Sequence, residues 1–256
     1  METVELATLL GKPQRISDLG NVSPLWKANV IIGTLECLTV WMKKLSAQQL
    51  LAECVCAVIG RSIGMPIPRP FLVYDEKGFA GEVNSLPFFA MEDAKHPSVR
   101  RWLARTDDPV IWEALLRWAS IQECALFDEW VANIDRNQGN LLYDGVGDFM
   151  MIDHAHALGG ASEPYSLPHH TDCVRNIIAD WLLPRFSVSQ NVGFSESADK
   201  KVAEWQSGLV EMERNSVPHL YGMEREVQNV SEFLRDRLPK LRELIDSRAG
   251  VPRLGL

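Results

Sequence analysis

Asp135, Asn140 and Asp153 supply two carboxylates and one amide within a short stretch of the chain. Asp135 and Asn140 are spaced as D-x-x-x-x-N, and Asp153 directly follows the apolar run 149–152. Carboxylate and amide oxygens bind Mg²⁺, and a further carboxylate can accept the proton of an attacking hydroxyl. The set therefore suits phosphoryl transfer, with Asp135 at the acceptor and with Asn140 and Asp153 as metal ligands.

A predicted hairpin explains how these groups would meet. Residues 141–143 and 149–152 have strand character, and the intervening segment 144–148 has the acidic and glycine residues of a turn. Pairing of the two strands would place Asn140 near Asp153. A calcium-binding loop that starts at Asp135 is excluded, because its sixth and twelfth positions would be Asn140 and Val146 instead of glycine and glutamate.

The histidines of the same stretch offer an alternative chemistry. His154 and His156 form H-x-H, which on a strand directs both imidazoles to one side. Together with Asp153, His169 and His170 they could form a zinc or two-metal hydrolase site. This alternative leaves the D-x-x-x-x-N pattern without a role. For His156, the simpler interpretation is a structural one, in which it orients the loop after the acid.

A lysine and a glutamate upstream could bind the phosphates of a nucleotide. The predicted strand 35–44 ends in Lys43 and Lys44, and Ser46 is a candidate N-cap of a helix that carries Glu53. An ion pair with Glu53 would hold the lysine on the phosphates. Strand alternation turns only one lysine inward. Lys43 follows two bulky residues as in V-A-I-K, so Lys43 is the predicted phosphate ligand and Lys44 the alternative.

Two other segments are candidates for nucleotide contacts. The turn at residues 20–23 could hold phosphates through backbone N–H groups, or it is a plain turn; its candidate residues are Gly20, Asn21 and Ser23. The apolar run 88–91 is the candidate connection between two lobes, with Met91 predicted to contact adenine through its backbone. An ordinary buried strand is the alternative for this run.

The order of predicted elements favours an α+β fold with two lobes. Strands and one helix precede Met91, whereas helices are predicted over residues 110–131, 172–183, 198–214 and 221–245, the last interrupted at Pro239. A strand-rich lobe with one helix, a connector and a helical lobe is the organisation of a two-lobed protein-kinase-like fold. The prediction is one kinase domain with a small N-lobe over residues 1–91 and a larger helical C-lobe over residues 92–256.

Composition restricts the partners of the protein. The net charge of -8 favours neither nucleic acid nor an anionic membrane as a partner. The five cysteines include no CxxC pair, which favours free thiols over disulfides or zinc ligands. No apolar run reaches membrane-spanning length, and the acids near the start do not fit a signal peptide. We therefore expect a soluble, cytoplasmic protein.

The catalytic stretch also resembles a known family. NIDRNQGNLL followed by MMIDHAHAL resembles the N-x-D-R-x-x-x-N and I-D-H signature of HipA-like kinases, and more distantly that of phosphatidylinositol kinases. The similarity covers about residues 15–160 and is greatest to the short HipA-like branch. The resemblance implies a protein-kinase-like fold, ATP and Mg²⁺ as cofactors, and phosphorylation of protein Ser or Thr. It also implies that Asp135 is the base and that Asn140 and Asp153 are the metal ligands.

Two departures from the common protein-kinase pattern are themselves similar to HipA. Asn133 occupies the position where many protein kinases have His, and Asp153-His154-Ala155 replaces D-F-G. The predicted function is therefore an ATP- and Mg²⁺-dependent kinase acting on a protein Ser or Thr or on a small-molecule hydroxyl. A catalytically idle nucleotide-binding module and the metal-dependent hydrolase remain the alternatives. An antitoxin-type partner occurs with such kinases, although no residue of this chain indicates one.

Overall fold

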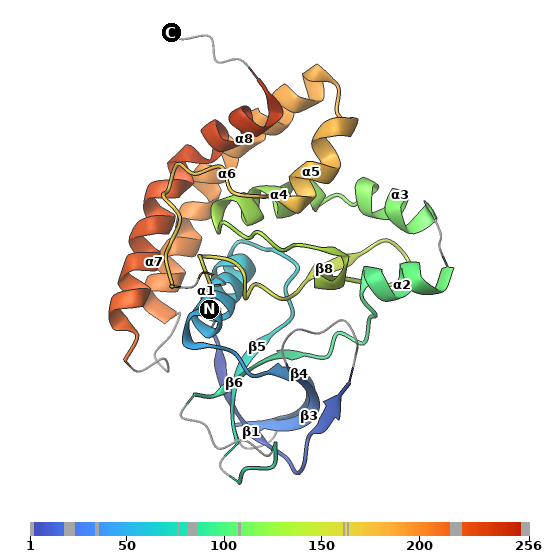
Figure 1. Ribbon diagram of the computed structural model, residues 1–256, viewed down its shortest axis with the longest axis vertical. Coiled ribbons are helices and arrows are strands. Elements are labelled where there is room, and N and C mark those ends of the chain that lie inside the picture. Colours follow the sequence, from blue (N-terminus) through green and yellow to red (C-terminus); the bar gives the residue numbers. More distant parts are fainter. Residues whose placement is uncertain are drawn as a thin grey trace.

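The computed structural model describes residues 3–17, 24–33, 36–75, 77–80, 86–106, 109–160, 162, 164–215 and 222–251. Figure 1 shows that the strands of the N-terminal part gather at one end of the molecule and that the helices of the C-terminal part form the other end. The predicted α+β organisation, with a strand-rich N-terminal part and a helical C-terminal part, is confirmed. None of the helices in the described ranges is long and apolar enough to span a membrane.

The strands of the N-terminal part form a sheet that closes on itself. The sheet order is β1-β5-β6-β4-β3-β2, and β1 also pairs with β3, which closes the ring. β1 and β2 pair with the same edge of β3, β1 near Ile32 and β2 near Leu25. β1 and β5 run parallel, whereas the other described pairs are antiparallel. The bounds are β1 (Glu5–Leu9), β2 (Gln14–Ile16), β3 (Leu25–Ile32), β4 (Glu36–Lys43), β5 (Pro70–Tyr74) and β6 (Phe88–Glu92).

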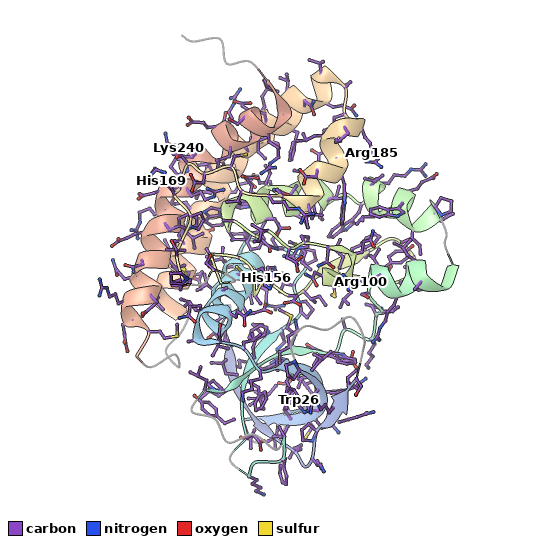
Figure 2. The ribbon with its side chains drawn as sticks, in the orientation of Figure 1. Trp26, Arg100, His156, His169, Arg185 and Lys240 are labelled. Atoms are coloured by element: carbon purple, nitrogen blue, oxygen red, sulfur yellow. The ribbon has the colours of Figure 1, made fainter. Side chains whose placement is uncertain are left out.

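Alternate side chains of these strands fill the interior of the ring. Trp26 lies within it (Figure 2), and its indole meets the ring of Phe88 edge-on at a centroid distance of 5.4 Å. Because successive side chains of a strand point to opposite faces, the burial of Val40 and Met42 inside the ring turns Lys43 to the outer face. The other buried members include Ala7, Leu9, Ala28, Val30, Phe71, Val73 and Ala90.

Helix α1 (Ala47–Ser62) connects the sheet to the helical part. Ser46 caps it as predicted: the Gln49 N–H donates to Ser46 Oγ (3.3 Å), and the Ser46 N–H donates to Gln49 Oε1 (3.2 Å). All residues from Leu50 to Gly60 are buried, since α1 packs against both the sheet and α6 (Val188–Asn215). The only charged side chain in that buried run, Glu53, therefore lies in largely apolar surroundings.

The regular elements of the C-terminal part, within the described ranges, are helices and one small hairpin. Pro239 interrupts the last helical segment as predicted, because it lies in the short 3-10 helix η3 between α7 and α8. The bounds not given above are α2 (Val99–Thr106), α3 (Pro109–Arg117), α4 (Ile121–Trp130), η1 (Gln138–Asn140), β7 (Leu141–Tyr143), β8 (Phe149–Met151), α5 (Ile177–Leu182), η2 (Leu183–Arg185), α7 (Glu224–Arg237), η3 (Leu238–Lys240) and α8 (Leu241–Ala249).

The prediction of one continuous helix over residues 110–131 is wrong. The chain leaves the helix after Arg117 and starts α4 at Ile121, and the Ile121 N–H donates to the Trp118 carbonyl across the break (3.1 Å). Trp118 is buried against Phe149 of β8, at a ring distance of 5.4 Å. Apolar residues continue across the break because both helices face the core, so periodicity alone did not mark it.

Other helix boundaries also differ from the predicted ones. The sequence did not predict α2. The helix predicted over residues 172–183 starts only at Ile177, where the Asn176 side chain accepts the Ala179 N–H (3.0 Å). In contrast, α6 begins at Val188 instead of residue 198. An Asn cap requires an extended backbone at the cap residue, so the chain before Ile177 cannot continue the helix.

Candidate active site

The loop between α4 and η1 presents Asp135 at the surface and Asn140 below it. The Asp135 side chain is 39% exposed, whereas Asn140 is buried. The Asn140 amide nitrogen donates to the Asp135 carbonyl (2.6 Å) and faces Asp135 Oδ2 at 3.3 Å. With its nitrogen directed at Asp135, the Asn140 amide group keeps its oxygen for another ligand, and no hydrogen bond to that oxygen is found within the described ranges.

The predicted hairpin is present and brings Asn140 toward the strand end. β7 and β8 pair antiparallel with Leu141 opposite Met151, and the Ile152 N–H donates to the Asn140 carbonyl (3.1 Å). The turn is closed by Asp144, whose Oδ1 accepts the N–H groups of residues 146, 147 and 148. Asp153 therefore follows directly on the residue that bonds to the Asn140 backbone.

Asp153 has a backbone conformation that is unusual for its residue type. Its φ is +62°, in the left-handed region, which aspartate tolerates better than most residues but which still costs energy. Its Oδ2 forms an ion pair with Lys43 Nζ at 2.5 Å. Burial alone would raise the pKa of Asp153, but the charge and hydrogen bond of Lys43 outweigh it and hold that pKa below its ordinary value. Asp153 is therefore an anion held by Lys43, which ends strand β4 of the N-terminal part.

Glu53 lies behind this ion pair instead of forming it. Its Oε2 accepts the backbone N–H of His154 (2.9 Å), and no ion pair joins it to Lys43 in the described part of the chain. Burial, followed by the charge of Asp153, raises the pKa of Glu53 to about 7. The ammonium group contacts the more accessible carboxylate, since reaching the buried one would remove more of its water. A role of Glu53 in holding Lys43 on phosphates stays a prediction.

The two histidines of H-x-H lie in different environments. His154 is fully buried, and neither of its ring nitrogens has a hydrogen-bond partner among the residues that are described. Burial, and after it the charge of Arg136, lower the pKa of His154, so its ring is neutral. His156 is 40% exposed, with Nδ1 3.9 Å from Asp135 Oδ2. No described group of three His, Cys, Asp or Glu residues could hold a metal, so the zinc alternative finds no support.

A buried ion pair that sequence reasoning missed anchors the loop at residues 133–137, which carries Asp135. Arg136 and Asp128 are both fully buried and form two hydrogen bonds, Nε to Oδ2 (3.1 Å) and Nη2 to Oδ1 (3.0 Å). Burial opposes the charge of Arg136, but Asp128 outweighs it and raises the pKa of the guanidinium. Nη1 donates to the carbonyls of Asn140 (3.3 Å) and Ile152. One side chain thus ties α4 to the residue before β7 and to the residue after β8.

Asn133 completes this anchor. Its Nδ2 donates to Asp128 Oδ1 (2.8 Å), and its Oδ1 accepts the Asp135 N–H (3.2 Å). The position that many protein kinases fill with His thus supports the backbone of Asp135. An acid inside the apolar run of α4, eight residues before an arginine next to Asp135, is the sequence signal that would have indicated Asp128.

The remaining predicted residues have different outcomes. Gly20, Asn21 and Ser23 lie outside the described residues. Met91 is buried inside β6, where it pairs with Trp41 of β4 and with Pro70 of β5. A backbone contact of Met91 with adenine stays a prediction.

A sequence model described as HipA-like kinase matches residues 36–184, which is more than half of the chain. The chain belongs to the HipA-like kinase family. The match includes Lys43, Glu53, Asp135, Asn140 and Asp153, so the family assignment and the cluster of side chains described above fall on the same segment. The protein is therefore a kinase, as its sequence predicted.

Solved structures add a fold comparison. A crystal structure of the Helicobacter pylori proinflammatory kinase CtkA is similar over 96% of this chain and 98% of that chain, with 10% sequence identity and a TM-score of 0.41. No curated protein matches the sequence.

Proposed function

We propose that this HipA-like kinase uses ATP and Mg²⁺ to phosphorylate the hydroxyl of a protein Ser or Thr. The observation that carries the proposal is the contact between the two parts of the molecule, in which Lys43 Nζ lies 2.5 Å from Asp153 Oδ2. Asn140 bonds to Asp135, and its carbonyl accepts the N–H of Ile152, the residue before Asp153. One cation, two candidate metal ligands and an accessible carboxylate thus lie on four neighbouring segments, as phosphoryl transfer requires.

The donor atoms suit a magnesium ion. Asp153 is ionised, and Asn140 has its amide nitrogen engaged with Asp135, which leaves the amide oxygen for a cation. Both are hard oxygen ligands of the kind that Mg²⁺ prefers. When bound, Mg²⁺ neutralises the charge that develops on the phosphate oxygens. Lys43, already beside Asp153, would contact the same phosphates.

Asp135 would receive the acceptor. Its carboxylate would orient the hydroxyl and accept its proton while the hydroxyl oxygen bonds to the γ-phosphorus and the bond to ADP breaks. The neighbouring Ile134 is also 39% exposed. An open base next to an exposed apolar side chain supports a protein acceptor, because a folded or peptide chain can cover both residues.

The test is transfer of label from γ-labelled ATP to the acid-insoluble protein fraction of a cell lysate, in the presence of Mg²⁺. Asp135→Ala should abolish the label, whereas Asp148→Asn, which changes an exposed acid of the β7–β8 turn, should retain it. Phosphoamino-acid analysis should yield phosphoserine or phosphothreonine. Label that survives Asp135→Ala would refute the role of Asp135, and label found only in small molecules would refute the protein acceptor.

The role of Lys43 has its own test. Lys43→Ala should weaken ATP binding, measured by titration calorimetry, more than Lys44→Ala does, because Lys43 is the lysine that forms the ion pair with Asp153. The reverse result would move the phosphate contact to Lys44.

A further inference from the structure

Asn137 bonds to the proposed base, Asp135, and nothing in the sequence pattern gave it a role. Its Nδ2 donates to Asp135 Oδ1 (3.0 Å) and lies 3.3 Å from the Asp135 carbonyl. Its Oδ1 accepts the Gly139 N–H (2.8 Å) and Nη2 of Arg100 (2.6 Å). The amide thus connects the carboxylate of the base to a helix of the C-terminal part.

Arg100 determines which way the amide faces. A flipped amide would turn its NH₂ group toward the guanidinium and toward the Gly139 N–H, so that donors would meet donors, and its oxygen toward an anion. The charge-assisted bond from Arg100 therefore favours the orientation in which Nδ2 faces Asp135. Arg100 is an exposed residue of α2, which lies against η1, and Figure 2 shows it and His156 at the level between the sheet and the large helices.

Close packing keeps this arrangement in place. A Cβ at Gly139 would lie 2.9 Å from Asn137 Oδ1 and 3.0 Å from Cζ of Arg100, so a larger residue at this position would push the two apart. Asn137 also caps η1, the turn that ends in Asn140. The orientation of the amide is therefore coupled to the segment that carries the candidate metal ligand.

The two oxygens of Asp135 consequently have different surroundings. Oδ1 is held by Asn137, whereas Oδ2 faces Asn140 at 3.3 Å and His156 at 3.9 Å. We propose that Asn137, oriented by Arg100, is a positioning residue that fixes the Asp135 carboxylate so that Oδ2 receives the acceptor proton. The inference rests on the proposed function, because it assigns a hydrogen-bond donor to Asp135, the proposed base.

The isosteric variant Asn137→Asp separates positioning from capping. Aspartate keeps the oxygen that accepts the Gly139 N–H and the bond from Arg100, but it replaces the donor to Asp135 with a second anion. We expect kcat to fall about 10- to 100-fold, with the KM for ATP within about twofold and the melting temperature unchanged or raised. A role in capping alone would leave kcat unchanged, and that result would overturn the proposal.

Two substitutions of Arg100 provide a second test, with a larger and a smaller expected effect on kcat. Arg100→Ala lets the amide rotate and should lower kcat about 3- to 10-fold, with Arg100→Lys restoring part of the loss through a single charged donor. Lys95→Gln, which changes an exposed cation just before α2, is the matched control and should retain wild-type kcat. Equal kcat values for Arg100→Ala and the wild type would remove Arg100 from the proposal.

A measurement independent of turnover keeps the inference separate from the proposed function. The side-chain amide protons of Asn137 can be assigned by NMR as the signals lost in Asn137→Asp. They should shift in both Asp135→Ala and Arg100→Ala, and not in Lys95→Gln. Unchanged signals in Asp135→Ala would overturn the inference. If the wild type transfers no phosphate while these signals shift as expected, the proposed function fails and the link from Asn137 to Asp135 stands.

Discussion

The loop at residues 133–137, which carries Asp135, has a buried face and an exposed face: Asn133 and Arg136 are buried, whereas Ile134 and Asp135 are partly exposed. Asn133 and Arg136 turn inward to Asp128, whereas Asp135 and Asn137 turn outward. The inward residues bond to backbone groups as well as to Asp128, and so hold the loop and the hairpin in place. The loop thus separates rigidity from reactivity: one face provides the stability that allows the other to remain accessible. Substitutions on the two faces should therefore affect different measurements.

The largest effect is expected on the exposed face. Asp135→Asn keeps the shape of the side chain but removes the proton acceptor, so phosphoryl transfer should fall about 10²- to 10⁴-fold. The free energy of unfolding, measured by urea denaturation, should change little, because Asp135 is 39% exposed. A large loss of stability in this variant would show that the exposed face also holds the fold, and the separation of roles would be wrong.

The next effect belongs to the buried face. Asp128→Ala leaves the Arg136 guanidinium buried without its carboxylate, and removing one partner of a buried ion pair costs about 3–5 kcal/mol. Urea denaturation should show this loss. Glu113→Ala, which breaks the exposed pair of Glu113 with Arg117, should leave stability unchanged within error. An Asp128→Ala protein as stable as the wild type would contradict the anchoring role.

Glu53 extends the comparison to pH. Its pKa of about 7 in the folded protein lies above the ordinary value of 4.5, so between these values the folded state retains a proton that the unfolded state has lost. Stability should therefore fall by up to ~3 kcal/mol as pH rises from about 4.5 to 7. Glu53→Gln cannot ionise and should lack this part of the decrease. Parallel stability curves for the two proteins would show that Glu53 titrates normally.

The smallest effect is expected far from the loop. Ser46→Ala removes the cap of α1, which should cost ~1 kcal/mol of stability. Activity measured well below the melting temperature should be retained, because α1 stays packed between the sheet and α6. Loss of activity in this variant at full folding would indicate that the cap also positions Glu53.

Local sequence patterns predicted the elements that short segments determine. The capping box of α1 and the β7–β8 turn each depend on groups only a few residues apart, and both are present. The break at Trp118 was missed because its cause is a contact with Phe149, far along the chain. The α2 helix was missed as well, because its apolar residues are few. Trp102 of α2 is held by a contact far along the chain, since its indole N–H donates to the Tyr143 carbonyl.

The sequence by itself determined the family, the α+β order of the elements and the side chains that can do the chemistry, because residue type and short spacing suffice for these. Only the tertiary structure decided which partner each group has. It paired Lys43 with Asp153, buried His154 while exposing His156, and directed Asn137 to the base. These outcomes depend on burial and on the distances between segments far apart in the chain, which residue spacing does not contain.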